Sequence, residues 1–334
     1  MGEEALCCPR SPRRDVVAAS EVSKDFQDGT RRVEIVFTDV DGTLLNGKQE
    51  LTLEVERAIK ASTDAGVPVV MATGKAVGPW LNDVLPRIPR PIARIHLQGQ
   101  CILDADGAVL RAQALPADVL EAVHSFARKY HSTLVFYTSD KVFGEQLNAH
   151  TERLLFYGEP KPEKVPDLSR FVEETRKREN GFHVESMVLP GQGADSYSSP
   201  VLKALILESE EVMPGLRARL AAELGSRAHL TSALPGMLEV LSAGACKGAG
   251  VAWLLDRLGI SPENAMALGD GENDAEMLRT VGLGVAMANA VDPTLEAADA
   301  VTLSNDANGV ACAIRRYVLK PREKPAEDGA RGNK

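Results

Sequence analysis

The stretch Glu34–Leu45, with the sequence EIVFTDVDGTLL, decides the fold that we expect for this chain. It begins with a β-branched and aromatic run long enough for one buried strand, and Gly42 permits a sharp turn after it. Asp39 and Asp41 stand one residue apart where the strand ends, so on an extended backbone both carboxylates can point to the same side. Ligands of open α/β sheets bind at the carboxyl ends of the strands, which is where we expect chemistry. Taken alone, the pattern DxDG is equally well explained by an ordinary turn.

The composition excludes several classes of protein. The chain has 334 residues, of which 44% are hydrophobic and 25% charged, as in a soluble globular protein of one large or two medium domains. A net charge of -9 argues against a nucleic-acid partner, because a surface that binds nucleic acid is normally basic. No apolar run approaches the roughly 18 residues of a membrane span, so we expect no membrane partner. The five cysteines lack zinc-site spacing, which indicates a reducing compartment and a cytoplasmic protein.

Both ends of the chain are predicted to be disordered. The leader, residues 1–32, shows little hydrophobic periodicity, and the tail, residues 319–334, is rich in Lys, Arg, Glu, Gly and Pro. The start Met1-Gly2 fails as a myristoylation signal because Leu6 stands where Ser or Thr is required. Acidic residues in the leader count against a transit peptide, but a plastid or another organelle stays open as the alternative to the cytoplasm.

Strands and helices alternate at both ends of the ordered region, which predicts a parallel sheet flanked by helices. A helix capped by Thr52 and ended by Gly66 separates the first strand from the second. Another helix starts at Lys247 and ends at Gly259. Further strands are expected at 67–72, 93–97, 265–268, 283–287 and 300–303.

The middle of the chain has a different pattern, with strands in runs and helices between them. Helices are expected from Pro116, near 167–177 and at 212–224, and strands at 133–137, 183–188, 201–207, 228–231 and 237–241. This pattern predicts an α+β unit with an antiparallel sheet. We therefore divide the chain into a discontinuous core domain, residues 33–111 and 237–318, and an inserted cap domain, residues 112–236.

Three strands are followed by polar clusters that a parallel sheet would bring together at one edge. Carboxylates crowd together only where a cation neutralises them. Mg²⁺ is the natural choice, because it takes hard oxygen ligands and keeps room for phosphate oxygens. Calcium is the alternative, but the EF-hand spacing is absent. The clusters are Asp39 with Asp41, Thr73 with Gly74, and Asp270 with Asn273 and Asp274.

Beside a metal, one aspartate can attack phosphorus and form an aspartyl-phosphate. Lys247 suits the charge that such a step must offset, since its ammonium and the N–H groups of a helix start can both face a phosphate. The alternative for a single Lys at a helix start is a solvated surface charge. The residue types alone leave open whether Asp39 or Asp41 is the nucleophile.

Together these motifs resemble, in the same order, the four motifs of the haloacid dehalogenase (HAD) superfamily. The last motif and the segment Gly284–Ala290 resemble the Cof-type branch, subfamily IIB. The resemblance covers about Val33–Tyr317, and four motifs in order, each after a suitable strand, are highly specific. The motifs are Asp39–Leu44, Ala72–Gly74, Lys247 and Gly269–Asp274.

The resemblance implies a Rossmann-like α/β core with a parallel sheet and an inserted α+β cap domain of the C2B type. It implies that Asp39 is the nucleophile and Asp41 the general acid and base. It also implies a Mg²⁺ ion held by Asp39, the backbone carbonyl of Asp41 and Asp270, with Asp274 supporting the metal shell. The residues expected to bind the substrate and its phosphate are Thr43, Thr73, Gly74, Lys247 and Asn273.

The chain departs from this family pattern in three places. Lys75 stands where Arg is common after Thr-Gly, which keeps the charge but loses the bidentate fork, and this Lys is similar to that of the mannosyl-3-phosphoglycerate phosphatases. Gln98-Gly99-Gln100 replaces the usual Asn-Gly-Ala, so the contacts of that loop with substrate or cap cannot be transferred. The leader has no counterpart.

We therefore predict a Mg²⁺-dependent phosphatase, a phosphomonoester hydrolase that forms an aspartyl-phosphate at Asp39. The expected partner is a small phosphorylated metabolite such as a sugar phosphate, pyridoxal phosphate or flavin mononucleotide, over which the cap closes. The alternatives are a phosphosugar mutase on the same scaffold, a mannosyl-3-phosphoglycerate-type phosphatase, and a binding module without catalysis. The oligomeric state is left open. Candidates for substrate contact in the cap are Tyr137, Lys141, Phe143 and Tyr157.

Overall fold

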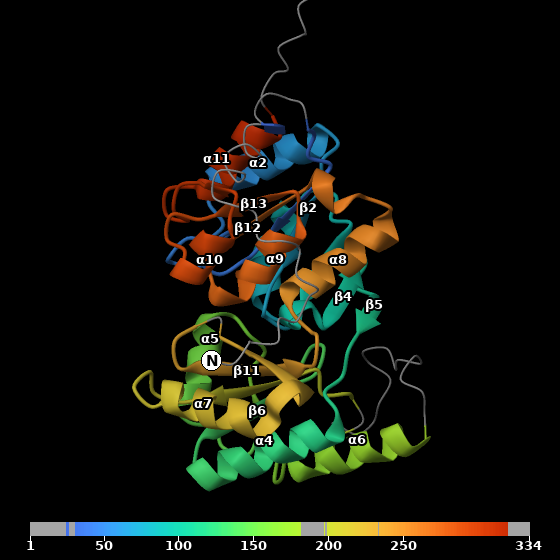
Figure 1. Ribbon diagram of the computed structural model, residues 1–334, viewed down its shortest axis with the longest axis vertical. Helices are drawn as coiled ribbons and strands as arrows, with labels where there is room; N and C mark the ends of the chain where they lie inside the picture. The colour runs from blue at the N-terminus through green and yellow to red at the C-terminus, as the bar shows by residue number, and fades with distance from the viewer. Residues whose placement is uncertain (1–24, 27–30, 182–196, 198, 233, 320–334) are drawn as a thin grey trace, which may run out of the picture.

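The computed structural model describes residues 25–26, 31–181, 197, 199–232 and 234–319. Figure 1 shows two bodies, each built on one sheet and stacked along the long axis of the molecule. The predicted strand at 183–188 and nearly all of the predicted leader and tail lie outside the described residues. Among the described residues, each helix is too short or too polar to span a lipid bilayer.

The first sheet has eight strands in the order β14-β13-β12-β1-β2-β3-β4-β5. Neighbours from β14 to β3 are parallel, so the predicted parallel sheet is confirmed. Strand β1 lies between β12 and β2, with Phe37 beside Ala267 and Val70. The carboxyl ends that carry the polar clusters are therefore adjacent. The strands are β1 (Ile35–Thr38), β2 (Val69–Ala72), β3 (Ala93–His96), β4 (Cys101–Asp104), β5 (Val109–Ala112), β12 (Ala265–Gly269), β13 (Leu283–Ala286) and β14 (Ala300–Val301).

Helices cover both faces of the first sheet, because its central strands are buried on both sides (Figure 1). Val36 of β1 packs in one cluster with Val55 and Ile314, while the next residue, Phe37, packs on the other face with Leu254. The flanking helices are α2 (Leu53–Asp64) and α11 (Gly309–Tyr317) on the first face, and α8 (Lys247–Leu258) and α9 (Ala275–Thr280) on the second. Shorter helices are α3 (Trp80–Val84) and α10 (Asp292–Ala297).

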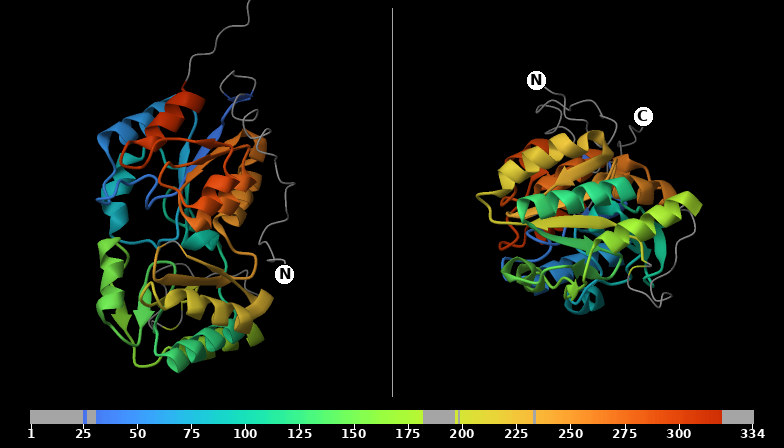
Figure 2. Two further views of the ribbon diagram at one scale, coloured as in Figure 1. Left: turned by 60° about the vertical axis from the view of Figure 1, so that its left-hand side comes forward. Right: turned by 90° about the horizontal axis from the view of Figure 1, so that it is seen from below.

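The second sheet has six strands in the order β10-β11-β9-β6-β7-β8, and all pairs except β7 with β8 are antiparallel, as predicted. The helices over its outer face lie side by side, as the view from below in Figure 2 shows. The strands are β6 (Thr133–Tyr137), β7 (Val142–Gly144), β8 (Glu163–Lys164), β9 (Lys203–Leu207), β10 (Ala228–Thr231) and β11 (Met237–Ser242). The outer helices are α4 (Ala117–Tyr130), α6 (Ser169–Gly181) and α7 (Met213–Leu224), and α5 (Ala149–Phe156) lies nearer the first sheet.

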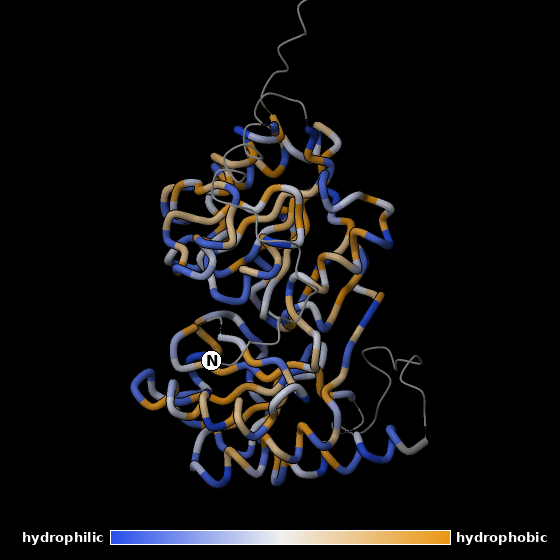
Figure 3. Tube along the Cα trace, in the orientation of Figure 1, coloured by the Kyte–Doolittle hydropathy of each residue, from blue (hydrophilic) through white to orange (hydrophobic). Residues whose placement is uncertain are grey.

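Alternation along the strands of the second sheet gives it two different hydrophobic faces. Phe136 and Ile206 point toward the outer helices, whereas Val135 and Leu205 belong to a cluster shared with Leu97 of the first body. Figure 3 shows hydrophobic residues concentrated along the strands of both sheets. The inner face of the second sheet is therefore available to line a site between the two bodies.

The hairpin β4–β5 extends the first sheet and was not among the predicted strands. The sequence did contain a turn signal for this hairpin, because Asp106-Gly107 lies between two short apolar runs. In the structure Gly107 adopts a φ of +90° in that turn. Part of the predicted leader also belongs to this body. Phe26 is buried in the hydrophobic core, and Arg31 Nη1 lies 2.6 Å from Glu263 Oε2.

The chain crosses between the two sheets twice, and the crossings are adjacent. Ser242 Oγ, at the end of β11, donates to the carbonyl of Ala114, just after β5, at 2.8 Å. The predicted return to the core at residue 237 differs from the structure, because Met237–Ser242 pairs with β9 and β10 of the second sheet. A short apolar strand carries no local information about which sheet it joins, so the true return, after Ser242, depends on pairing.

Candidate active site

Asp39 lies at the carboxyl end of β1, where the ends of β12 and β2 meet. Its backbone N–H donates to the carbonyl of Leu268 at 2.9 Å, which ties β1 to β12. Lys247 Nζ lies 2.5 Å from Asp39 Oδ1 and 2.7 Å from Asp274 Oδ1. Lys247 is only 1% exposed, which excludes the alternative of a solvated surface charge. Burial alone would lower the pKa of Lys247, but the Asp274 and Asp39 carboxylates outweigh it and raise that pKa.

Asp274 is completely buried, and both of its oxygens have protein partners. Oδ1 accepts a hydrogen bond from Lys247, and Oδ2 accepts the backbone N–H groups of Asp270 and Gly271 at 2.9 Å each. The close approach requires Gly269, since a Cβ there would lie 2.4 Å from the Cβ of Asp274. Asp274 therefore orients Lys247 and the loop that carries Asp270.

Three carboxylates form a candidate metal site. Asp39, Asp270 and Asp274 offer oxygens that all lie within 4.8 Å of one another. Thr43 Oγ1 donates to Asp270 Oδ1 at 2.6 Å and holds that carboxylate in place. Burial raises the pKa of Asp270 to about 7, and the charge of Asp274 adds to the shift. Desolvated carboxylates with oxygens this close form the hard donor set that a small divalent cation neutralises, so these residues fit the expected Mg²⁺.

Asp41 points into the same site, and Lys75 replaces the expected Arg beside it. Lys75 Nζ lies 2.7 Å from Asp41 Oδ1 and donates to Gln49 Oε1 at 3.3 Å. The ammonium is also 5.2 Å from the centre of the Trp80 ring. Thr73 is buried, and its hydroxyl accepts the backbone N–H of Lys75 at 3.1 Å. Lys75 therefore acts on Asp41 as a single positive charge, without the two parallel hydrogen bonds of an Arg.

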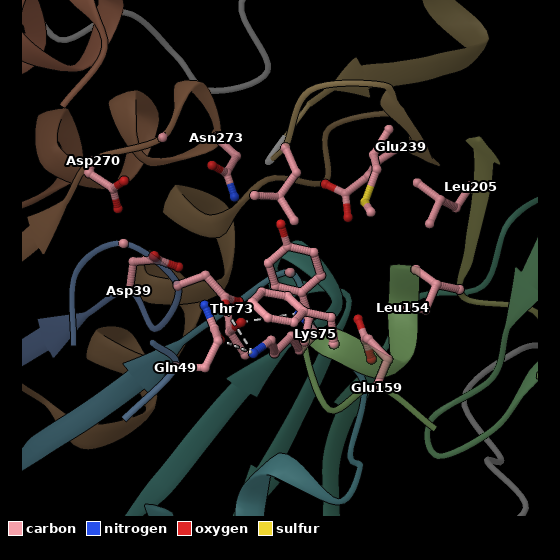
Figure 4. A pocket seen from close by; sticks show the side chains of 18 of the residues that line it. Asp39, Gln49, Thr73, Lys75, Leu154, Glu159, Leu205, Glu239, Asp270 and Asn273 are labelled. Carbon is pink, nitrogen blue, oxygen red and sulfur yellow. Dashed lines mark hydrogen bonds and ion pairs between the residues drawn. The ribbon is translucent and has the colours of Figure 1, made fainter. Parts of the chain in front are cut away.

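A cavity of about 270 Å³ opens from these residues toward the second sheet. In Figure 4, Asp39, Asp270 and Asn273 lie on one side of the cavity, and Leu205, Leu154, Glu159 and Glu239 on the other. The further lining residues that matter below are Asp41, Thr73, Gly74, Lys75, Tyr137, Lys203 and Met237. The predicted site residues of the first body that line the cavity are Asp39, Asp41, Thr73, Gly74, Asp270 and Asn273, while Thr43, Lys247 and Asp274 lie behind them.

The loop Gln98-Gly99-Gln100, which departs from the family pattern, contacts the second body directly. The Gln98 amide accepts a hydrogen bond from Asn273 Nδ2 at 3.0 Å and donates to Glu239 of β11. Gln100 accepts the backbone N–H of Ser242 at 2.8 Å and donates to the carbonyl of Leu202. Both glutamines are fully buried. This loop is therefore a polar junction between the two bodies.

Lys203 completes the junction from the inner face of the second sheet. Its Nζ donates to Glu239 Oε1 and to the carbonyl of Gly74, each at 2.6 Å. Neither Lys203 nor Glu239 was singled out in the sequence. The signal was a single charged residue inside each of two apolar strands, a pattern that is rare unless the charge is paired or functional.

Of the four candidate substrate contacts predicted in the cap, two line the cavity and two do not. Tyr137 and Tyr157 line the cavity. Lys141 instead pairs with Glu163 at 3.3 Å on the exposed surface, and Phe143 is buried among the outer hydrophobic residues of the second sheet. Periodicity alone could not separate them, because Tyr137 and Phe143 lie on neighbouring strands but on opposite faces.

Comparison with known proteins identifies the protein family. Residues 36–314 match the family described as haloacid dehalogenase-like hydrolase. The 5-amino-6-(5-phospho-D-ribitylamino)uracil phosphatase YcsE of Bacillus subtilis is 29% identical over 287 residues, with 86% of this chain and 96% of that protein covered. The chloroplastic endoribonuclease YBEY of Arabidopsis thaliana is 30% identical over 311 residues, covering 87% of this chain, but the chain spans only 48% of that relative's length.

A solved structure agrees with the sequence comparison. BT1666 from Bacteroides thetaiotaomicron, described among phosphatases of the haloalkanoate (HAD) enzyme superfamily, superposes with a TM-score of 0.68 at 26% identity. The match covers 86% of this chain and 96% of BT1666. The chain belongs to the haloacid dehalogenase-like hydrolases, in the predicted Cof-type branch. Its relatives in this family include named phosphatases, and the chain itself is built from a Rossmann-like core and an α+β cap.

Proposed function

We propose that this chain is a Mg²⁺-dependent phosphomonoester hydrolase that works through an aspartyl-phosphate at Asp39. The observation that carries this is the contact of Lys247 with both Asp39, which lines the cavity, and Asp274, which lies behind it. A buried ammonium beside the nucleophile offsets the repulsion between a carboxylate and a phosphate. We treat residues 33–111 and 243–318 as the catalytic core and residues 112–242 as the cap.

Two aspartates carry the two steps of the reaction. First, a carboxylate oxygen of Asp39 attacks phosphorus, the bond from phosphorus to the ester oxygen breaks, and the Asp41 carboxyl gives its proton to the leaving oxygen. Asp41 then takes a proton from water, the water oxygen attacks phosphorus, and the bond to Asp39 breaks. Inorganic phosphate leaves and both side chains return to their starting states. Lys75 Nζ, 2.7 Å from Asp41 Oδ1, orients the Asp41 side chain for both proton transfers.

The phosphate would lie between the ends of β1, β2 and β12. Bound by Asp39, the carbonyl of Asp41 and Asp270, Mg²⁺ would supply positive charge next to the phosphate. Thr43 holds Asp270, and Thr73 and Gly74 offer a hydroxyl and a backbone N–H from the end of β2. The Asn273 amide, oriented by Gln98, lines the cavity beside them.

The size of the cavity supports a small phosphorylated metabolite as the substrate. About 270 Å³ accommodates a small molecule, and the relative YcsE is named for a phosphorylated ribitylamino-uracil. We do not transfer the ribonuclease activity of the Arabidopsis relative, since this chain spans about half of that protein. The same relative, named as chloroplastic, supports a plastid as the alternative to the cytoplasm.

Phosphate release from a panel of phosphorylated metabolites, with and without Mg²⁺, tests the proposal. We expect metal-dependent release that falls by at least about 10³-fold in Asp39→Asn, because the nucleophile is removed while its shape is kept. Isomerisation of a sugar phosphate without phosphate release would indicate a mutase. Release that is unaffected by Asp39→Asn or by chelation of Mg²⁺ would refute the proposal.

A further inference from the structure

One buried hydroxyl on the cap side of the cavity lacks a hydrogen-bond partner in the described part of the chain. Tyr137, on β6, is fully buried and lines the cavity, yet its Oη has no hydrogen-bond partner among the described residues. A buried hydroxyl without a partner is unfavourable for folding. When such a hydroxyl borders a ligand cavity, a ligand atom that forms the missing hydrogen bond explains it.

Glu159, just after α5, is a second incomplete group on the same wall. It is 6% exposed, and its Oε2 accepts the backbone N–H of Ala76 at 3.1 Å, while no described residue donates to its Oε1. Burial raises the pKa of Glu159 to about 7, against the opposing effect of Lys203 and Lys75. The carboxyl is therefore held in place by one oxygen and presents the other to the cavity (Figure 4).

The other charges on the cavity wall already have partners close by. Lys75 lies 2.7 Å from Asp41, and Lys203 lies 2.6 Å from Glu239. Glu159 makes no ion pair within the described part of the chain. Since each Lys is matched by its own carboxylate, Glu159 leaves this wall with an excess of negative charge whenever it is ionised.

The space between this wall and Asp39 is bordered by apolar side chains. Leu154, Leu205 and Met237 line the cavity between the polar groups. A ligand that spans the cavity would therefore place phosphate at Asp39, carbon atoms against these side chains, and its far end at Tyr137 and Glu159. The far end meets one hydroxyl and one carboxylate, with no free cation beside them in the described residues.

We infer that Tyr137 and Glu159 form a leaving-group subsite, which selects phosphate monoesters with an uncharged or cationic far end that carries O–H or N–H donors. The carboxylate of Glu159 accepts from such donors, and the Tyr137 hydroxyl pairs with a neighbouring ligand oxygen or nitrogen. A leaving group with a second anion is rejected, because it would lie against an unpaired carboxylate away from bulk water. This subsite rests on the proposed function, since it is defined relative to a phosphate at Asp39.

Three phosphate esters of equal carbon length test the subsite. Glucosamine 6-phosphate, glucose 6-phosphate and 6-phosphogluconate present a cationic, a neutral and an anionic far end. With the full chain and Mg²⁺, we expect kcat/KM for the first two to exceed that for the third by about tenfold or more. Glu159→Gln, which can still accept from Ala76, should narrow this ratio by about tenfold, chiefly through KM. Tyr137→Phe should raise KM for the neutral ester.

Glu163→Gln is the matched control, because Glu163 is an exposed cap residue whose contact is with Lys141. It should leave the ratio between the three esters as in the parent protein. A ratio that is the same in the parent and in Glu159→Gln, or a preference for 6-phosphogluconate, would overturn the subsite.

Binding separates this subsite from the proposed reaction. Calorimetry of the same esters with Asp39→Asn and Mg²⁺ measures affinity without turnover. If the parent releases no phosphate but the affinities keep the predicted order, the proposed hydrolysis fails and the subsite stands. If phosphate is released but the three affinities are equal, or none binds, the subsite fails and the hydrolase stands.

Discussion

Lys247 shows how far a single residue depends on its neighbours. An ammonium that is 1% exposed is costly to desolvate, and it is tolerated here because Asp39 and Asp274 lie within 2.7 Å of it. Sequence alone placed Lys247 at a helix start, where a solvated surface charge was the favoured interpretation for this residue taken by itself. Only the parallel arrangement of β12 and β1 brings residues more than two hundred positions apart into this contact.

Gly42 gives a prediction at the residue scale. Its φ is +79°, and a Cβ at this position would lie 2.2 Å from Asp270 Oδ2. Gly42→Ala should therefore displace the Asp270 carboxylate and lower kcat/KM by about 100-fold. A displacement of about 1 Å in an active site can lower the rate by about this factor. Gly66→Ala is the matched control, because Gly66 has a φ of +84° but open space around a Cβ.

Both variants share the backbone cost of a left-handed Ala, about 1–2 kcal/mol in the free energy of unfolding. Urea denaturation and steady-state kinetics measure the two effects separately. Equal activity in both variants would mean that the Asp270 carboxylate tolerates displacement.

His96 gives a second prediction at this scale. Burial lowers the pKa of His96 to about 4, although its ring contacts the carbonyl of Lys75 at 3.2 Å. Below pH 6.5 the unfolded chain binds a proton at His96 and the folded chain does not, so the free energy of unfolding falls as the pH falls toward 4. Between pH 6.5 and 5 this residue should account for a loss of about 2 kcal/mol.

Urea denaturation of the parent and of His96→Leu, at both pH values, isolates this contribution because the other groups cancel in the difference. We expect a smaller loss in His96→Leu. Parallel pH dependences would show that His96 is not responsible.

At the scale of elements, hydrophobic pattern and turn residues were sufficient for most strands and helices of both sheets. Thr52 caps α2, as predicted, by accepting the N–H of Val55 at 3.2 Å. The pattern was insufficient where the choice of partner strand decides the outcome. Met237–Ser242 could join either sheet by composition, and the short strands β7 and β8 contain too few residues to show a period.

The junction around Gln98 gives a prediction at this scale. Gln98→Ala removes the partner of the Asn273 amide and one partner of Glu239, in a region where an unpaired polar group costs about 1–3 kcal/mol. We expect kcat to fall by about tenfold. Gln113→Ala is the control, since the one contact of the Gln113 side-chain amide with the described residues is exposed and weak, 3.4 Å from the carbonyl of Ala243.

If Gln98 acts by positioning Asn273, then Asn273→Ala should cost less in the Gln98→Ala background than in the parent. Steady-state kinetics on the four proteins of this cycle decide the point. Strictly additive effects would place the role of Gln98 elsewhere.

At the scale of the whole molecule, the four motifs identified the family, whereas the residues that the cap brings to the cavity could not be predicted from sequence. Residues such as Glu159, Lys203 and Glu239 reach the cavity only because two sheets face each other, and no local pattern encodes that meeting. The bodies are also linked at the surface. Arg217 of α7 forms a paired contact with Glu272, next to Asn273 in the first body.

This surface link gives a prediction for the cap as a unit. Both side chains are more than one-third exposed, so a double-mutant cycle with Arg217→Gln and Glu272→Gln should give a coupling below about 1 kcal/mol that weakens with salt. KM should rise about twofold in each single variant, because the cap is held less firmly. The pair Lys60–Asp64, which lies within α2, is the control and should not affect KM.

A salt-independent coupling, or an equal change of KM on breaking the Lys60–Asp64 pair, would rule out a role of Arg217 and Glu272 in holding the cap.

The hydrogen bond from Ser242 to Ala114 brings the exit and the return of the chain to one place on the core. A segment inserted at a single point can be exchanged without moving the strands on either side of the insertion. Asp39, Asp41, Lys247, Asp270 and Asp274 all lie outside the inserted segment. The inserted cap, and with it the substrate specificity, can therefore be exchanged as a unit during evolution while the reaction stays the same. The same two crossings are the positions at which a new cap could be joined to this core by protein engineering.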